Sequence, residues 1–295
     1  MAKDAKEVTN MAEYAIRPRS GKTVIGIDVG GSTTKIVGFT PEGELIAPQN
    51  VKATDPVTSA YGAFGKFTLE HRIKLDNIDR VNMTGVGSAF ISEPIYSLPC
   101  CSVGEFDSIG IGGLYLSGLS EAIVVSMGTG TAITYAKRTG DSVKTDYLGG
   151  TGVGGGTITG LSKKLLGIDS VRHLEEYCRG GNLANVDLRI CDISRPDTYP
   201  DMNADLTASN FGKISDLATG ADIAAGIFNM VAETVAMMSI FASRKYSTRD
   251  IVLIGNLTNI RPICDTFAGL APKFNVNFIV PELSGFGTVI GAALQ

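Results

Sequence analysis

Short apolar runs rich in β-branched residues alternate with longer stretches of helical periodicity along most of the chain. The runs Thr23–Asp28 and Thr34–Phe39 flank a glycine-rich turn, which predicts the two strands of a hairpin. The other elements expected in this half are a strand at Leu45–Pro48, a helix at Val57–Arg72, a strand at Val81–Thr84 and a helix at Glu105–Ser117.

The same succession of patterns begins again after residue 118, where the runs Ala122–Ser126 and Ala132–Ala136 flank a second glycine turn. The elements expected after this hairpin are a strand at Lys144–Leu148, a helix at Thr157–Leu166, a helix at Ala221–Ser243, a strand at Ile251–Ile254, a helix at Thr258–Leu270, a strand at Asn275–Val280 and a helix at Phe286–Leu294. Two hairpin-plus-helix units indicate a loose internal duplication. Alternating strands and helices favour an α/β sheet covered on both faces.

The chain has 295 residues, 44% of them hydrophobic, which allows a large core in one or two domains. We expect a tail at residues 1–21, an N-terminal lobe at 22–118 and a C-terminal lobe at 119–295. With 26 basic and 30 acidic residues the formal net charge is −4, and no long run of Lys or Arg occurs. This balance argues against a nucleic-acid surface.

Nothing in the pattern indicates a membrane protein or an oxidising compartment. The N-terminal segment lacks the apolar core of a signal peptide. The expected helix at Ala221–Ser243 is interrupted by Asp222, Asn229 and Glu233, so we do not expect it to span a membrane. Five cysteines form no CxxC pair, which suits a reducing compartment. A soluble, cytoplasmic protein is the expectation.

Candidate chemistry lies in the glycine turns. In DVGGSTTK the donors are backbone N–H groups at Gly30 and Gly31, the hydroxyls of Ser32, Thr33 and Thr34, and the ammonium of Lys35. Such a set suits the β- and γ-phosphates of a nucleotide. Asp28 is acceptor-only at a strand end and suits Mg²⁺, directly or through a metal-bound water. An ordinary glycine-rich turn remains the alternative.

Two further segments repeat this chemistry. In SMGTGTAITYA the turn is formed by Gly128, Thr129, Gly130 and Thr131, and two such turns facing each other would clamp a phosphate chain. In GGTGVGGGTITGL six glycines, among them Gly154, Gly155 and Gly156, precede a helix expected from Thr157, so free helix N–H groups are expected there. Neither a Rossmann fingerprint nor a Walker A motif is present. Gly255, in IVLIGNL, ends a strand where backbone can lie flat against a base or ribose.

These segments, in this order, resemble the phosphate-1, phosphate-2 and adenosine elements of the actin–hexokinase–Hsp70 superfamily. The resemblance implies an α/β, actin-like (ribonuclease H-like) fold, duplicated into two lobes with ATP in the cleft between them. The further segments GEFDSIG, VDLRICDI and LTASNFGK resemble type II pantothenate kinases, and the similarity runs from about Val24 to Leu294.

That family resemblance implies ATP-dependent phosphorylation of the primary hydroxyl of pantothenate to 4′-phosphopantothenate, the first step of coenzyme A biosynthesis, with ATP and Mg²⁺ as cofactors. It assigns the general base to Glu105, and a homodimer with its interface on the long helix. The alternative for Glu105 is a helix N-terminal acid stabilised by the helix dipole. Asp107 is expected to cap the same helix. Thr129, Thr131 and Tyr147 are the expected acceptor-binding residues.

Two positions depart from the family pattern, and both lie on the acceptor side. Tyr147 stands where the family usually has an arginine, and Ala132 where it usually has a serine. Three explanations are open: another cation such as Lys144 or Arg138 replaces the arginine, the acceptor lacks pantothenate's carboxylate as pantetheine does, or the protein is a weak or non-catalytic paralogue.

Three rival functions share the nucleotide chemistry. ATPase activators of 2-hydroxyacyl-CoA dehydratases begin similarly but need thiolates for an iron–sulfur cluster, and Cys100–Cys101 is badly spaced to supply them. A sugar kinase would want an aspartate base. A regulatory module would bind ATP without turnover.

Overall fold

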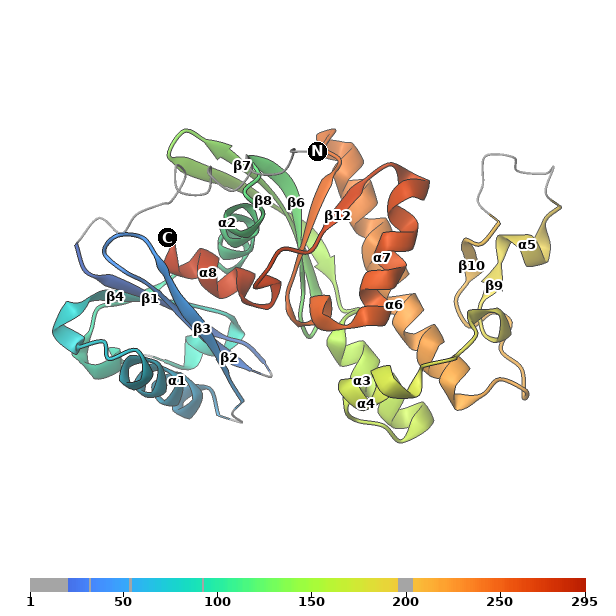
Figure 1. Cartoon of the computed structure of the whole chain (residues 1–295), viewed down its shortest axis with the longest axis horizontal. Helices are drawn as coiled ribbons and strands as arrows, with labels where there is room; N and C mark the ends of the chain where they lie inside the picture. Colours follow the sequence, from blue (N-terminus) through green and yellow to red (C-terminus); the bar gives the residue numbers. More distant parts are fainter. Residues whose placement is uncertain (1–20, 32, 53–54, 92, 196–203) are drawn as a thin grey trace, which may run out of the picture.

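Two five-stranded mixed sheets of the same topology form the framework of the protein (Figure 1). The computed structural model describes residues 21–31, 33–52, 55–91, 93–195 and 204–295. The first sheet has the order β3-β2-β1-β4-β5, with β1 at Thr23–Val29, β2 at Thr34–Phe39, β3 at Leu45–Val51, β4 at Ile78–Thr84 and β5 at Cys100–Ser102. The second has the order β12-β11-β6-β7-β8, with β6 at Glu121–Met127, β7 at Thr131–Thr139, β8 at Ser142–Thr151, β11 at Asp250–Ile254 and β12 at Asn277–Ile279.

Each sheet consists of a three-stranded antiparallel meander whose first strand pairs in parallel with a later strand, which in turn pairs in parallel with a fifth strand. The first strands are β1 and β6, and their parallel neighbours are β4 and β11. This equivalence confirms the internal duplication and the two-lobed α/β fold that the sequence predicts.

Local sequence explains where the main helices begin and end. The helix α1, Pro56–Glu70, starts with Pro56 and is capped by Asp55, whose carboxylate accepts the N–H of Thr58 at 2.7 Å. The long helix α6, Gly220–Tyr246, begins with a capping box between Thr219 and Asp222, and Lys and Arg lie in its last turn. These signals fix the ends of helices whose apolar faces form the cores of the two lobes.

The remaining helices are α2 at Glu105–Ser117, α3 at Gly155–Leu166, α4 at Val171–Tyr177, α5 at Ile190–Ile193, α7 at Arg261–Phe274 and α8 at Gly287–Ala293. A small antiparallel pair, β9 at Leu188–Arg189 and β10 at Thr207–Ser209, lies with α5 beyond α6 and α7 (Figure 1). Several sequence-based bounds are off by one to three residues, as at the strands Leu45–Val51 and Ile78–Thr84, and two further differences concern helix starts. The helix α3 begins at Gly155 instead of Thr157, and the helix expected at Thr258–Leu270 is split into a 3₁₀ turn, Asn256–Asn259, and α7. The split falls at Ile260, the N-cap residue of α7, which is extended with φ −102° and ψ 110°. Pro262 lies in the first turn of α7, where its missing N–H costs no helical hydrogen bond.

The helices α2 and α8 exchange sheets. α2 precedes residue 118 in sequence yet packs on β6, β7, β8 and β11, whereas the C-terminal α8 packs on β1, β2 and β4. They also contact each other so closely that a β-carbon on Gly112 would overlap the carbonyl of Gly287. The domain boundary expected near residue 118 stays a prediction, because α2 and α8 each pack on the sheet that belongs to the other part of the chain.

The core of the second lobe surrounds α6, with Phe228, Val231 and Val235 buried against β6 and α7. By length and composition α6 could cross a membrane, but 61% of its most apolar window is buried inside the protein. The Met-rich part of α6 is likewise mostly buried, with Phe241 exposed. The helix therefore serves as the central core helix of this lobe. The first lobe has its own core, in which Phe64 and Phe67 of α1 pack on β1.

Candidate active site

A cavity of about 440 Å³ lies where strand ends and turns of both sheets meet. The expected site residues that line it are Asp28, Gly30, Gly31, Thr33, Lys35, Glu105, Gly128, Thr129, Gly130, Thr131 and Gly255. Ser32 lies outside the described residues. Gly154, Gly155, Gly156 and Tyr147 are not among the lining residues. Segments far apart in the sequence thus converge on one interlobe site.

The two glycine turns face each other across this cavity. In the β1–β2 turn the N–H of Gly30 donates to the carbonyl of Thr33 at 3.0 Å. Its neighbour Gly31 points toward the β6–β7 turn, where a β-carbon on Gly31 would lie 3.9 Å from Oγ1 of Thr129. Backbone N–H groups and hydroxyls from two sides are thereby brought into one space, which is the arrangement that suits a polyanion.

The glycine run after β8 supports the β6–β7 turn from behind. The N–H groups of Gly155 and Gly156 donate to the carbonyls of Gly128 and Thr129, both at 2.9 Å, and the N–H of Gly154 donates to Oγ1 of Thr157 at 3.1 Å. The expectation that these N–H groups are free is therefore wrong, because the structure uses them to shape the turn. Direct contact between these glycines and ATP stays a prediction.

Asp28 and Lys35 form the charged floor of the cavity. They are direct partners in the antiparallel pairing of β1 with β2. Burial raises the pKa of Asp28 to about 6, although the charge of Lys35 opposes the shift. Burial also lowers the pKa of Lys35, whose Nζ donates to the carbonyl of Gly285 at 2.5 Å. The lysine therefore ties the floor of the cavity to the segment that leads into α8.

Glu105 is the first residue of α2 and lies at the cavity wall. Burial raises the pKa of Glu105, and its charge in turn raises the pKa of Asp28. The prediction that Asp107 caps α2 is wrong. No side chain caps this helix at Gly104, and the Asp107 carboxylate instead accepts a hydrogen bond from the hydroxyl of Thr145 on β8. Glu105 is thus the acid of this turn that faces the cavity.

The acceptor-side residues expected from the sequence have separate environments. Thr131 lines the cavity, and its hydroxyl donates to the carbonyl of Val153 at 2.9 Å. Ala132 also lines the cavity. Tyr147 lies outside it and stacks on Phe106 of α2, with ring centroids 3.7 Å apart and an angle of 12° between the rings. The strand bulges just after Tyr147, because Leu148 has no partner on β7 and Gly149 adopts φ +118°.

Six further described residues line the cavity. Ser126, Thr151 and Asn256 lie within segments that the sequence analysis singled out, whereas Gly85, Val86 and Thr288 had no distinctive sequence signal. Gly85 follows β4 with φ +86°, and a β-carbon there would lie 2.5 Å from Oδ1 of Asp28. Gly255 has φ +98°, and a β-carbon would lie 2.5 Å from the carbonyl of Met127. Only glycine fits at these two strand ends, because both backbone conformation and close packing exclude a side chain.

The described residues contain no group of three or more His, Cys, Asp or Glu that could hold a metal ion alone. Asp28 nevertheless fits a magnesium ion, which takes one or two carboxylates and obtains its other ligands from water and phosphate oxygens. A buried carboxylate with a raised pKa is a group that a divalent cation would stabilise in its charged form.

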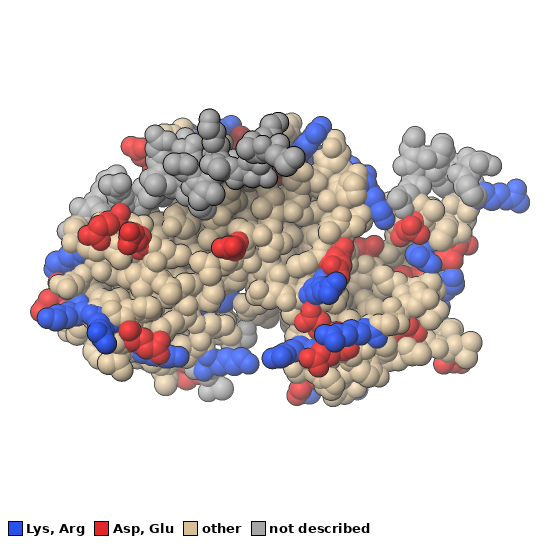
Figure 2. Space-filling model, viewed as in Figure 1, with Lys and Arg blue, Asp and Glu red and all other residues tan. Residues whose placement is uncertain are grey.

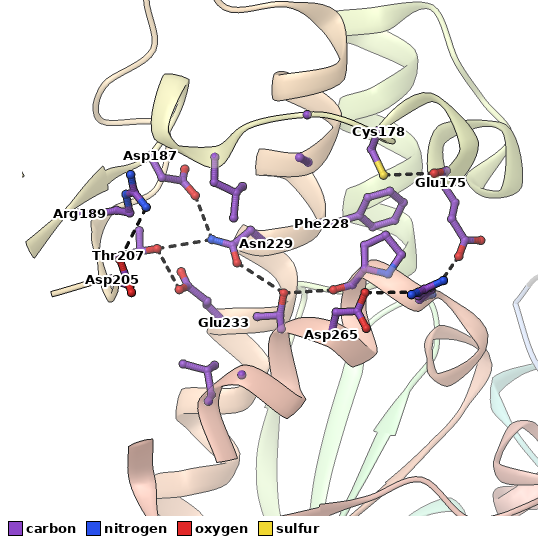
Figure 3. A pocket seen from close by; sticks show the side chains of 18 of the residues that line it. Glu175, Cys178, Asp187, Arg189, Asp205, Thr207, Phe228, Asn229, Glu233 and Asp265 are labelled. Carbon is purple, nitrogen blue, oxygen red and sulfur yellow. Dashed lines mark hydrogen bonds and ion pairs between the residues drawn. The ribbon is translucent and has the colours of Figure 1, made fainter. Parts of the chain in front are cut away.

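A second and larger cavity, of about 960 Å³, lies in the second lobe among α4, α6, α7 and the segment that carries β9 and β10 (Figure 3). Fully buried Asp187 accepts hydrogen bonds from Nδ2 of Asn229 at 2.9 Å and from the N–H of Phe211 at 2.8 Å. Glu233 accepts from Thr207 at 2.8 Å and Asn210 at 3.1 Å. The segments VDLRICDI and LTASNFGK are therefore connected to α6 by buried and partly buried hydrogen bonds, away from the interlobe cavity.

The sequence of this chain is similar to those of known proteins. The profile of the family described as Fumble matches residues 120–277. A type II pantothenate kinase of Staphylococcus aureus (strain USA300) is 30% identical over 242 residues, which cover 79% of this chain and 84% of that protein. This chain belongs to the type II pantothenate kinase family.

The fold of this family member also resembles solved structures of low sequence identity. Component A of (R)-2-hydroxyglutaryl-CoA dehydratase from Acidaminococcus fermentans has a TM-score of 0.65 at 16% identity and covers 92% of this chain and 96% of that one. A ROK family glucokinase from Streptomyces griseus, in complex with glucose and AMPPNP, has a TM-score of 0.53 at 15% identity and covers 92% and 98%. These likenesses confirm the actin-like fold of the type II pantothenate kinase family member.

The charge distribution of this family member is mixed on the face shown in Figure 2. Lys and Arg side chains are interspersed with Asp and Glu side chains there instead of forming one continuous field of a single sign. The acidic and basic residues visible on that face therefore give no large patch complementary to a polyanionic chain.

Proposed function

We propose that this protein transfers the γ-phosphoryl group of ATP, with Mg²⁺, to the primary hydroxyl of pantothenate or of a pantothenate amide such as pantetheine. With pantothenate the product is 4′-phosphopantothenate, the first intermediate of coenzyme A biosynthesis. One observation carries the proposal: the two facing glycine turns, Asp28 and Glu105 line the same cavity, in a member of the type II pantothenate kinase family.

In the proposed complex the phosphates of ATP lie between the β1–β2 and β6–β7 turns. The N–H groups and hydroxyls around Gly30, Gly31, Thr33 and Thr129 donate to phosphate oxygens, and Lys35 supplies a positive charge. Gly255 and Asn256 also line the cavity, and the nucleoside would lie against them. Asp28 would hold the metal, which when bound neutralises charge on the β- and γ-phosphates.

Glu105 is the proposed general base. The acceptor oxygen attacks the γ-phosphorus, the bond from that phosphorus to the β–γ bridging oxygen breaks, and ADP leaves with the electron pair. Glu105 takes the hydroxyl proton as the new O–P bond forms. Its raised pKa makes the carboxylate a stronger base than an exposed glutamate. Such a base typically contributes about 10²–10⁴-fold in rate.

Closure of the lobes around both substrates would exclude water, which otherwise competes for the γ-phosphoryl group. The two lobes are joined by the close packing of α2 on α8 at Gly112 and Gly287, so relative movement of the lobes would pivot near this contact. We also propose a cytoplasmic homodimer, as the family resemblance implies. Its interface would include exposed Phe241 of α6.

A second candidate is an ATPase that drives electron transfer, which the fold likeness to the Acidaminococcus fermentans dehydratase component favours. The cysteines argue against it. Cys100 and Cys101 are adjacent on β5, and no cysteine lines the described part of the interlobe cavity. Anaerobic purification separates the two functions, since an iron–sulfur protein is brown and a kinase is colourless.

The test of the proposed function is identification of the product. The protein is incubated with MgATP and an equimolar mixture of pantothenate and pantetheine, and the products are examined by phosphorus NMR and mass spectrometry. A phosphomonoester on the acceptor's primary hydroxyl, together with stoichiometric ADP, is the expected result. ADP with inorganic phosphate and unmodified acceptors would contradict the proposal.

A further inference from the structure

An aromatic pair lies beside the proposed base, just outside the cavity. Phe106 follows Glu105 directly in α2, and Tyr147 of β8 stacks on it face to face. Although the two rings cover each other, Phe106 is still 39% exposed and Tyr147 46% exposed. The exposed ring surface of this stacked pair lies next to the cavity. It can pack against a neutral, flat or methyl-rich group.

The hydroxyl of Tyr147 points along β8 toward the cavity. A β-carbon on Gly150 would lie 3.2 Å from this oxygen, and Gly150 pairs with the cavity residue Ala132. The hydroxyl can both donate and accept a hydrogen bond without carrying charge. It therefore suits an amide group of an acceptor chain that leaves the cavity at this edge.

Among the described residues that line the cavity the cation is Lys35, which the proposed function assigns to the phosphates of ATP and not to the acceptor. The charged side chains among these residues are Asp28, Glu105 and Lys35. Lys35 is already bonded to the Gly285 carbonyl and lies opposite Asp28. The carboxylate of pantothenate, at the far end of the chain from the hydroxyl that Glu105 would deprotonate, would therefore meet no further cation among these lining residues.

The two cations that could replace a missing arginine lie elsewhere. On β8, Thr145 and Tyr147 face α2, where they contact Asp107 and Phe106. Asp146 faces the other side of the strand and accepts a hydrogen bond from Tyr246 of α6. Lys144 shares the side of Asp146, because side chains alternate along a strand. Arg138 pairs with Val143, four residues from Tyr147 and therefore about 13 Å along β8.

We propose that the preferred acceptor is an uncharged pantothenate amide of the pantetheine type, and that Phe106 and Tyr147 bind its amide chain. The inference rests on the proposed function and specifies its substrate class. Free pantothenate has a carboxylate at the end of the same chain, where the aromatic pair outside the cavity offers ring surface and a hydroxyl instead of a cation.

The experiment compares kcat/KM for pantothenate, for its primary amide and for pantetheine, because pantothenate and its primary amide are close in size and differ in charge. We expect both amides to exceed pantothenate by at least tenfold. Tyr147→Arg should raise kcat/KM for pantothenate by at least tenfold and reduce or reverse the preference, since it supplies a cation for the carboxylate. Tyr147→Phe, which keeps the stack, should retain the preference for amides.

Lys144→Ala serves as the matched control, because it removes a cation from the opposite side of β8 and should leave the ratio unchanged. Wild-type protein that uses pantothenate as well as its amide would overturn the inference while leaving the proposed function intact. So would a selective loss of pantothenate use in Lys144→Ala, since that would identify a compensating cation. ATP binding without transfer to any of the three acceptors would overturn the proposed function and the inference with it.

Discussion

Asp28 and Lys35 lie directly opposite each other on β1 and β2. Burial raises the pKa of Asp28 and lowers the pKa of Lys35, and both shifts favour the neutral form of the side chain. Their mutual attraction opposes both shifts without cancelling them. The charge of Glu105 adds to the cost of ionising Asp28. The free protein thus holds a carboxylate that would be stabilised by a bound cation, which is the property expected of a residue that helps to hold MgATP.

Asp28→Asn should stabilise the free protein at neutral pH and abolish turnover. The pKa of Asp28 is raised from 3.8 to about 6, so the stability of the wild-type protein falls as pH rises through this interval. The variant has no such loss, and the difference reaches up to about 3 kcal/mol above pH 6. Thermal unfolding without ligands from pH 4 to 8 measures it.

The control for this prediction is addition of MgATP. It should raise the unfolding temperature of the wild-type protein far more than that of Asp28→Asn, because only the wild type has the carboxylate for the metal. A variant that is less stable than wild type at pH 8, or equally stabilised by MgATP, would remove Asp28 from this role.

Glu105→Gln should keep its affinity for ATP and lose at least tenfold in kcat, because glutamine cannot accept the proton of the acceptor hydroxyl. The matched control is Asp107→Asn in the same turn, which contacts Thr145 instead of the cavity. Steady-state kinetics and ATP titration of both variants make the comparison. Undiminished turnover in Glu105→Gln would exclude Glu105 from the chemistry.

The rate should also depend on pH. As the pH is lowered, the rate should begin to fall at a higher pH than it would if the essential carboxyl groups had their ordinary pKa values. The pKa of Asp28 is raised to about 6 and that of Glu105 is also raised, and both groups act in their ionised forms. We therefore expect kcat/KM to decline as pH falls through about 6. A rate that is constant down to pH 5 would contradict the assigned roles.

Gly154→Ala should weaken ATP binding by at least tenfold, because the added β-carbon would lie 2.7 Å from the carbonyl of Thr129 and displace the β6–β7 turn. Gly152→Ala is the control in the same loop, since a β-carbon there meets no atom within 4 Å. Calorimetric titration with ATP compares the two. Equal affinities would show that the glycine run does not shape the nucleotide site.

Asn229→Leu should lower the free energy of unfolding by about 1–3 kcal/mol, because it leaves buried Asp187 with one of its two hydrogen bonds. Asp265→Asn, at an exposed ion pair with Arg261 of 3.6 Å, should have little effect. Denaturant unfolding measures both variants. A neutral Asn229→Leu would show that the network in Figure 3 does not hold the β9–β10 segment.

Much of the fold could be predicted because it is encoded locally. The apolar run ending at Asp28 and the helix starting at Glu105 have clear periodicity, and the predicted Glu105–Ser117 helix coincides with α2. The two facing turns could be predicted as well, since glycines and hydroxyls cluster at Gly30 and Gly128.

What could not be predicted depends on contacts between distant segments. The bond from Lys35 to Gly285 and the exchange of α2 and α8 between sheets have no local signal. Gly85 resembles any glycine after a strand, and its role follows only from its contact with Asp28. The N–H groups of Gly155 and Gly156 looked free because the turn that accepts them lies earlier in the chain.

The most direct measurement is ADP release by the purified protein with MgATP in the presence of pantothenate, pantetheine or no acceptor. The account predicts low release without acceptor and strong stimulation by an acceptor that carries the primary hydroxyl, with Glu105→Gln as the inactive control. ATP that binds without acceptor-dependent ADP release would contradict it and would favour an ATPase or a regulatory nucleotide-binding protein.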